Sequence, residues 1–209
     1  MWVVHKYDLL VDKIHYILGL SKKTKKVIYA RNCKISEINC NDSTDFLNKN
    51  HIMGFSYSTV YLGAYFENTL VGVMTFRNGS INTDGWELTR FAVDNDYICC
   101  GLGGKLFSYF VKNYNPSKIT SFADKRYTSS KNNLYLKIGF VSEKTTSLSY
   151  NYFKANEEGV PQLVHKLTYK NNCHDSQKTE SEAAKELGFD RIWNCGLIKY
   201  IWRKDDEEK

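Results

Sequence analysis

The fold is decided by residues 98–105, which read ICCGLGGK and combine three glycines with a terminal lysine. Aromatic and β-branched residues at 86–93 predict a strand before this stretch. Apolar residues at helical spacing predict a helix over 105–114 after it, which Pro116 stops. A glycine turn between a strand and a helix exposes backbone N–H groups where the helix dipole favours an anion. The turn is therefore a candidate phosphate site, although such turns also need glycine for steric reasons alone.

Working outward from the turn, the pattern alternates between strands and helices. The predicted order from residue 60 is three strands, the glycine turn, a helix, a strand, a helix and a further strand or pair of strands. The segments are 60–66, 70–76, 86–93, 105–114, 118–124, 130–138 and 141–153. This order predicts an α/β (α+β) domain. The unit 86–124 is expected to be a crossover that joins two parallel, neighbouring strands.

The flanking segments predict smaller elements. A helix is expected over 3–18, a strand over 27–38, and a short helix through Asn50 that is capped from 42–45. Near the C-terminus, Thr179 and Glu182 have the spacing of a capping box, and residues 194–196 resemble a hairpin turn. We therefore expect an N-terminal helix and basic linker over 1–26, a main domain over 27–169, and a helix–hairpin extension with an acidic tail over 170–209.

Composition and charge leave several partners open. The chain has 209 residues, 42% of them hydrophobic, which allows a buried core. Its net charge of +6 permits contact with nucleic acid or an anionic cofactor but requires neither. The lysines at 22–26 and the acids at 205–208 are most simply solvated surface.

The cysteines and the apolar runs indicate a cytoplasmic protein without a membrane span. Six cysteines include no Cys-x-x-Cys pair, and the first twenty residues mix charges with apolar residues, unlike a secretory signal. No apolar run approaches the ~18 residues that a membrane span needs. Reduced thiols in a cytoplasm are therefore expected. Cys173, His174 and Cys195 lack the fixed spacing of a zinc site, so no metal ligand is assigned.

Two matches give the sequence a resemblance to a known family. Gly101 and Gly103 fit the Gln/Arg-x-x-Gly-x-Gly/Ala turn of GNAT-type acyltransferases, and residues 134–140 resemble that family's Leu-Tyr-x-Lys-x-Gly-Phe segment. The resemblance covers about 27–155 and implies a mixed, mostly antiparallel central sheet with flanking helices. In that family the turn lies between the fourth strand and the third helix. Ile98 replaces its Gln/Arg, so coenzyme A is held less tightly, the donor differs, or the pocket is vestigial.

The resemblance implies a cofactor and roles for individual residues. Acetyl-CoA or another acyl-CoA would be the donor, with its pyrophosphate at the turn and its pantetheine arm along the backbone of β-strand residues. The implied cofactor-binding residues are Phe91, Ala92, Val93, Gly101, Gly103, Gly104 and Lys105. Tyr135 matches the tyrosine that protonates the leaving thiolate. Glu87 or Asp124 could be the general base, and both could equally pair with neighbouring basic side chains.

A narrower resemblance points toward nucleic acid. Residues 87–90 (ELTR) and 121–124 (SFAD) are similar to the Glu-Leu-Asn-Arg and Ser-Tyr-Ala-Asp strands of phage Mom-like proteins, which modify adenine in DNA to evade restriction. That likeness adds candidates to Tyr135, namely Arg90, Ser121, Asp124 and, through a weaker local match, His51. Phage homing-endonuclease-like proteins also resemble the chain from about Ile28 in their C-terminal regions, but no nuclease motif is present here.

Three functions compete at this point. The first is a phage, host-cytoplasmic transferase that acts on a nucleobase or another nucleic-acid-associated amine, with DNA as partner. The second is a non-catalytic DNA-binding module with a degenerate acyl-CoA pocket. The third is an ordinary acetyltransferase acting on a protein or small-molecule amine. A metal and a homodimer are compatible with each of them.

Overall fold

The computed structural model describes residues 6–20, 25–79, 85–155, 161–165 and 179–204. The predictions for Lys22 and Lys23, for Cys173 and His174, and for the acidic tail fall outside these residues. The helices are α2 (Tyr7–Ile17), the 3-10 helix η1 (Ala30–Asn32), α3 (Cys40–Asn50), α4 (Leu102–Tyr114), α5 (Leu134–Lys137) and α7 (Glu180–Glu186). In the part of the chain that the structure describes, none of them has the length and apolarity to span a membrane.

The strands form one large sheet and two small ones. They are β1 (Lys26–Tyr29), β2 (Lys34–Glu37), β3 (Val60–Phe66), β4 (Thr69–Asn78), β5 (Trp86–Val93), β6 (Tyr97–Cys100), β7 (Lys118–Asp124), β8 (Val141–Thr145), β9 (Tyr150–Ala155), β10 (Pro161–His165), β11 (Asp190–Trp193) and β12 (Leu197–Arg203). The large sheet has the order β2-β3-β4-β5-β7-β12-β8, and all neighbours in it are antiparallel except β5 and β7. The predicted mixed, mostly antiparallel sheet and the parallel crossover from 86 to 124 are confirmed.

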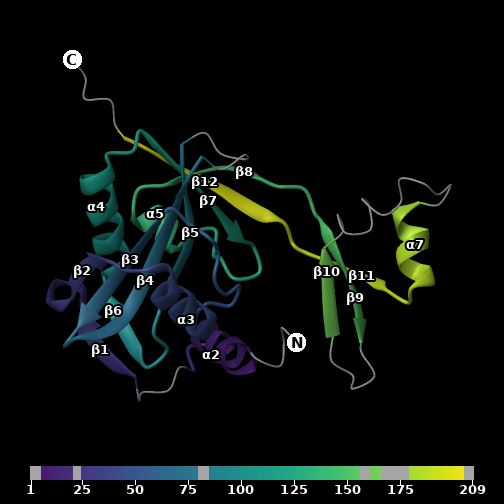
Figure 1. Cartoon of the computed structure of the whole chain (residues 1–209), viewed down its shortest axis with the longest axis horizontal. Coiled ribbons are helices and arrows are strands. Elements are labelled where there is room, and N and C mark those ends of the chain that lie inside the picture. The colour runs from purple at the N-terminus through teal and green to yellow at the C-terminus, as the bar shows by residue number, and fades with distance from the viewer. Residues whose placement is uncertain (1–5, 21–24, 80–84, 156–160, 166–178, 205–209) are drawn as a thin grey trace.

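Helices cover both faces of the large sheet (Figure 1). On one face, called the α4 face, the ring of Phe110 from α4 stacks on Phe76 of β4. On the other, called the α3 face, Leu47 of α3 packs with Val73 and Ala92. These side chains are fully or almost fully buried, and each contributes about 1.5–3 kcal/mol if it is large and apolar. The two layers fix β4 and β5 as the rigid centre of the fold.

The N-terminal part of the domain differs from expectation in two places. The strand expected over 27–38 is broken by η1 into β1 and β2, and β1 pairs in parallel with β6 rather than with the large sheet. Helix α3 begins at Cys40 because the Asn39 side chain accepts a hydrogen bond from the Asp42 N–H at 2.8 Å. The cap predicted at 42–45 is therefore three residues too late.

Strands β3 and β4 are joined by a hairpin turn. Glu67 and Asn68 have φ of 48° and 63°, the left-handed pair that matches strand twist in a two-residue turn. Helix α7 is confirmed, with Thr179 and Glu182 forming the predicted reciprocal cap.

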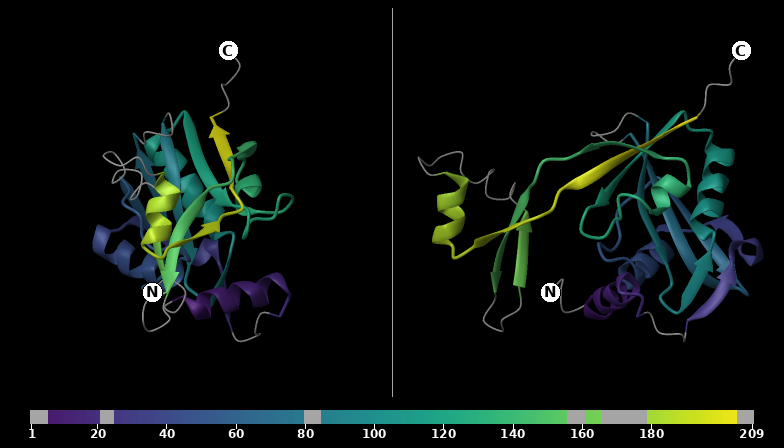
Figure 2. Two further views of the ribbon diagram at one scale, coloured as in Figure 1. Left: turned by 90° about the vertical axis from the view of Figure 1, so that its right-hand side faces the viewer. Right: turned by 180° about the vertical axis from the view of Figure 1, so that it is seen from behind.

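The prediction of a C-terminal hairpin is wrong. Strand β11 pairs with β9 in a separate sheet of order β10-β9-β11, while β12 enters the large sheet between β7 and β8. The two strands lie in different sheets because residues 194–196 run beside the segment that leads from β8 to β9 and form a two-stranded ribbon with it. Asn194 N–H donates to the Ser149 carbonyl at 2.8 Å within this ribbon. Figures 1 and 2 show the small sheet standing beside the main body, with α7 on its far side.

Candidate functional site

An opening between β5 and β7 is the centre of the candidate site. The two strands pair only at Trp86 with Ile119 and at Glu87 with Thr120, and then diverge. A bulge in the β4–β5 register inserts Thr89 as an extra residue, which bends β5 away from β7. The Ser121 hydroxyl donates to the Leu88 carbonyl at 2.8 Å and is the last link across the gap. We call the space beyond this link the notch.

The β5 wall of the notch carries backbone groups without a strand partner. The Asp94 N–H donates to the Val71 carbonyl at 3.0 Å, so alternation turns the N–H and C=O of Ala92 toward β4. The N–H and C=O of Phe91 and Val93 consequently face away from β4, toward the side that β7 has left. An extended ligand with amide groups can hydrogen-bond to such an edge.

The glycine turn ends in an uncapped helix N-terminus at the same end of β5. Gly101 occupies the N-cap position of α4 with φ of 79° and has no side chain that could accept a hydrogen bond. The first backbone N–H of the helix with an acceptor is that of Lys105. The preceding N–H groups at 102–104 lack acceptors among the described residues. A Cβ at Gly103 would lie 2.6 Å from Leu134 Cδ1, so the Leu134 side chain would have to move, whereas at Gly104 the nearest atom is 4.0 Å away.

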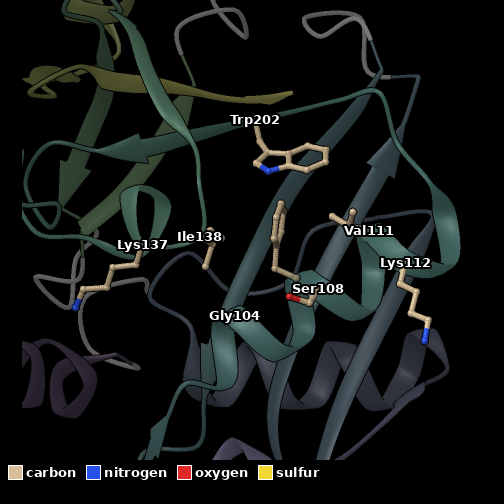
Figure 3. A pocket seen from close by; sticks show the side chains of 8 residues that line it. Gly104, Ser108, Val111, Lys112, Lys137, Ile138 and Trp202 are labelled. Atoms are coloured by element: carbon tan, nitrogen blue, oxygen red, sulfur yellow. The ribbon is translucent and has the colours of Figure 1, made fainter. Parts of the chain in front are cut away.

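Beside Gly104 a cavity of about 500 Å³ opens between α4, α5 and β12 (Figure 3). It is lined by Gly104, Phe107, Ser108, Val111, Lys112, Lys137, Ile138 and Trp202. Trp202 meets Phe107 edge to face at 5.5 Å between ring centroids, and Figure 3 shows Lys112 and Lys137 on opposite sides of the hollow. The cavity thus has an aromatic wall beside Gly104 and a lysine at each of two sides.

The structure does not place the side chains of Lys105, a predicted cofactor contact, and Ile98, at the family's Gln/Arg position, as phosphate ligands. Lys105 Nζ donates to the carbonyls of Ala30 at 2.9 Å and Cys33 at 2.5 Å, so this side chain holds η1 against α4. Ile98 is 45% exposed on β6, opposite Val27. Any phosphate at the turn would therefore meet backbone N–H groups, with Lys112 and Lys137 as the nearby cations of the cavity.

Tyr135 and Ser121 lie together on the α4 face of the notch. The Tyr135 ring stacks on Tyr200 at 4.7 Å and meets Phe140 edge to face. Burial raises the pKa of Tyr135, while a hydrogen bond with Ser121 and the charge of Arg90 oppose that rise. Tyr135 is therefore a protonated phenol at neutral pH and can act as an acid.

Arg90 and His51 meet on the α3 face. Arg90 Nε donates to the Gly54 carbonyl at 2.9 Å, which holds the loop after α3 over β5. The Met53 N–H donates to His51 Nδ1 at 3.0 Å, and burial, Arg90 and Lys6 together lower the pKa of His51 to about 3. His51 is therefore neutral, with its remaining proton on Nε2.

The two candidate bases are placed differently. Glu87 lies on β5 where the notch begins, and its charge acts on Arg90. Asp124 instead accepts hydrogen bonds from Arg126 in a bidentate pair, with Nη2 to Oδ2 at 2.6 Å. Burial alone would raise the pKa of Asp124, but the bonds from Arg126 outweigh it and the pKa is lowered. We find no hydrogen bond or ion pair that ties Asp124 to Arg90, Ser121 or Tyr135.

The predicted residues thus divide into two groups. Arg90, Ser121 and Tyr135 lie around the notch, with His51 near Arg90 and Glu87 in the paired stretch just before it. Asp124 and Lys105 are instead held by other partners. Three further participants were missed, namely Arg77, Tyr200 and Trp202. Arg77 stands opposite Glu87 on β4, and the two aromatic residues depend on β12 entering the large sheet. No local motif in the sequence marks these long-range pairings.

Comparisons with known proteins give only distant similarities. No protein-family model and no curated protein matches the sequence. Similar solved structures include a GNAT-family acetyltransferase of Bacillus cereus, at 12% identity over 82% of this chain and 97% of that chain, with a TM-score of 0.47. A GNAT-family acetyltransferase of Elizabethkingia anophelis with acetyl-CoA bound has 17% identity over 83% and 99%, with a TM-score of 0.45. A Bacillus subtilis acetyltransferase in complex with CoA has 14% identity over 83% and 98%, also at 0.45.

With likeness this low, the geometry of the notch carries the argument for function. That geometry joins an open strand edge, an uncapped helix N-terminus and a buried phenol within one end of the sheet.

Proposed function

We propose that the chain is an acyl-CoA-dependent N-acyltransferase of the GNAT type. The observation that carries the proposal is the open edge of β5 beside the uncapped N-terminus of α4. The edge suits the two amides of a pantetheine arm, and the helix end suits a pyrophosphate. The cavity next to Gly104 has an aromatic wall and two lysines, which suit an adenosine phosphate.

The residues of the notch have distinct roles in this proposal. Acyl-CoA supplies an activated thioester, and the chain holds that thioester between β5 and β7. Tyr135 donates its phenolic proton to the departing thiolate, and its raised pKa keeps it protonated until then. Ser121, whose own proton goes to the Leu88 carbonyl, can accept a hydrogen bond from the Tyr135 hydroxyl and so orient it. Glu87 is the base candidate that remains near the notch, because Asp124 is held by Arg126.

A pair of substitutions at Gly104 tests acyl-CoA binding separately from folding. Gly104→Glu places a carboxylate in the first turn of α4, where a negative charge stabilises the helix but repels a phosphate. We expect unchanged or higher stability together with at least tenfold weaker acetyl-CoA binding. Gly104→Gln, the uncharged control of the same size, should lose less affinity.

A thermal-shift measurement with acetyl-CoA gives the simplest readout. A ligand that binds only the folded state stabilises it by about 2.7 kcal/mol at a hundredfold excess over its dissociation constant. No shift with acetyl-CoA or other acyl-CoA donors would contradict the proposal and favour the non-catalytic DNA-binding module.

For the acceptor, we propose a nucleobase amine or another nucleic-acid-associated amine. The similarity of residues 87–90 and 121–124 to Mom-like strands supports this choice, as does the net charge of +6. A base inside a duplex is unreachable, so the substrate would be single-stranded or flipped. Tyr150 and Tyr152, which could have stacked on a base, instead pack within the small sheet.

Mass spectrometry of nucleosides distinguishes the acceptors. DNA from cells that express the protein should contain an acylated nucleoside, which Tyr135→Phe should strongly reduce. Unmodified nucleosides, combined with acyl transfer to peptide or small-molecule amines, would instead identify an ordinary N-acetyltransferase.

A further inference from the structure

Two arginines lie side by side on the α3 face of the sheet. Arg77 is on β4 and Arg90 is on β5, and both reach the same loop after α3. Arg77 Nη2 donates to Ser56 Oγ at 3.2 Å, and Arg90 Nε donates to the Gly54 carbonyl at 2.9 Å. Each side chain is half-buried rather than free in solvent. The two guanidinium groups are thus held in place by the same strip of backbone.

The positive charge at this place is poorly compensated. Neither arginine forms an ion pair with any carboxylate that the structure describes, although Glu87 lies opposite Arg77 and its charge acts on Arg90. Lys6 adds a third cation, since its Nζ donates to the carbonyls of Asn48 and His51. Three partly buried cations with one nearby carboxylate repel one another, so the arrangement favours an anionic ligand.

The pKa values of neighbouring groups are shifted in the direction that this excess charge predicts. Burial and then the charge of Arg77 lower the pKa of Arg90. The pKa of His51, at about 3, is lowered by burial, Arg90 and Lys6 in that order. Both shifts have the direction expected next to unpaired cations.

Both guanidinium groups also retain donors for a ligand. Arg77 Nε is buried and has no acceptor within the described part of the chain. Arg90 uses Nε for Gly54 and Nη1 for the Thr89 carbonyl, which leaves Nη2. The planar fork of arginine matches a carboxylate or a phosphate, and a buried donor without an acceptor costs about 1–3 kcal/mol until one arrives.

We propose that Arg77 and Arg90 together bind an anionic group of the acceptor, either a phosphate or a carboxylate. The word acceptor rests on the proposed function, whereas the anion site itself does not. Arg90 lies on β5 beyond its last pairing with β7, so the bound anion lies next to the notch. It lies on the α3 face, and the glycine turn leads into α4 on the other face, so the two anion sites are separate. This site would hold the acceptor by its charge while its amine enters the notch.

Calorimetric titration with inorganic phosphate and, separately, with acetate at constant ionic strength tests the site. Arg77→Met should weaken binding of the preferred anion at least tenfold, and Arg77→Gln, which can still bond to Ser56, should weaken it similarly. The matched control is Arg203→Met on the exposed end of β12, which should leave the affinity within twofold. Gly104→Glu should remove only phosphate bound at the glycine turn and should leave the Arg77-dependent binding unchanged. Stronger binding of phosphate points to a nucleotide-bearing acceptor, and stronger binding of acetate to a carboxylate-bearing one.

The outcomes separate this site from the proposed function. Undetectable binding of both anions, or equal affinity in the wild type and both Arg77 variants, would overturn the site. So would loss of binding in Gly104→Glu alone, because the anion would then occupy the glycine turn. Acetyl-CoA titrated into the same samples should bind Arg77→Met as it binds the wild type. If acetyl-CoA fails to bind any sample while Arg77→Met loses phosphate, the acyltransferase is refuted and the anion site stands.

Discussion

Strand β7 has two neighbours in the large sheet, and it pairs with them very differently. With β12 it pairs from Lys118 to Asp124, along its entire length. With β5 it pairs at only two positions. The contrast shows that β7 can pair along its whole length and that the opening arises from β5, where Thr89 forms the bulge. The fold therefore closes one side of β7 and keeps the other side available for a ligand.

The largest effect should come from Tyr135, which faces the open side. Tyr135→Phe removes the phenolic proton but keeps the ring that stacks on Tyr200. Loss of a general acid lowers turnover by about 10²-fold or more. Steady-state kinetics should show this loss in kcat, with little change in KM for acetyl-CoA. A variant with the wild-type kcat would remove Tyr135 from the mechanism.

The next effect concerns His51, which follows α3 and lies near Arg90 of the diverging strand β5. Unfolded His51 titrates near 6.5 and folded His51 near 3, so the unfolded chain binds the proton first as the pH falls. The stability present above pH 6.5 is therefore lost on acidification, by about 2 kcal/mol between pH 7 and pH 5. His51→Asn keeps an acceptor for Met53 and should lack this part of the loss.

Urea unfolding of both proteins at pH 7 and pH 5 measures the difference directly. Carboxylate titrations are common to the two proteins and cancel in the comparison. Parallel loss of stability in wild type and variant would show that His51 is accessible and protonated in the folded state.

These contrasts also explain which features the sequence could predict. The glycine turn, the hairpin at Glu67 and Asn68, and the capping box at Thr179 are local, so a few residues specify each of them. A local reading of the sequence pairs β12 with β11 in a hairpin. It misses the pairing of Tyr200 with Ser121, because that pairing spans most of the C-terminal half of the chain. For the same reason Arg77 was missed, since its position beside Arg90 follows from the strand register.

Two adjacent residues of β7 carry hydroxyl groups with different surroundings. Ser121 Oγ donates to the Leu88 carbonyl across the start of the notch, whereas the buried Thr120 Oγ1 has no partner in the described structure. Ser121→Ala leaves a buried carbonyl without its donor and should cost about 1–2 kcal/mol. Thr120→Val removes an unpaired hydroxyl and should be neutral or stabilising. Equal losses in urea unfolding would show that the Ser121 bond does not hold β5 to β7.

The smallest effect is expected at Asp124, which ends β7 on its closed side opposite Leu197. Asp124→Asn should cost at most about 1 kcal/mol, because its partner Arg126 is 42% exposed and water screens the pair. The lowered pKa of Asp124 means that this contribution is present at neutral pH and is lost as the pH falls below the ordinary value of 3.8. Since the carboxylate is paired with Arg126, the variant should keep kcat within about twofold, unlike a lost general base. A loss of a hundredfold or more, with stability unchanged, would instead make Asp124 the base and require Arg126 to release it when the substrates bind.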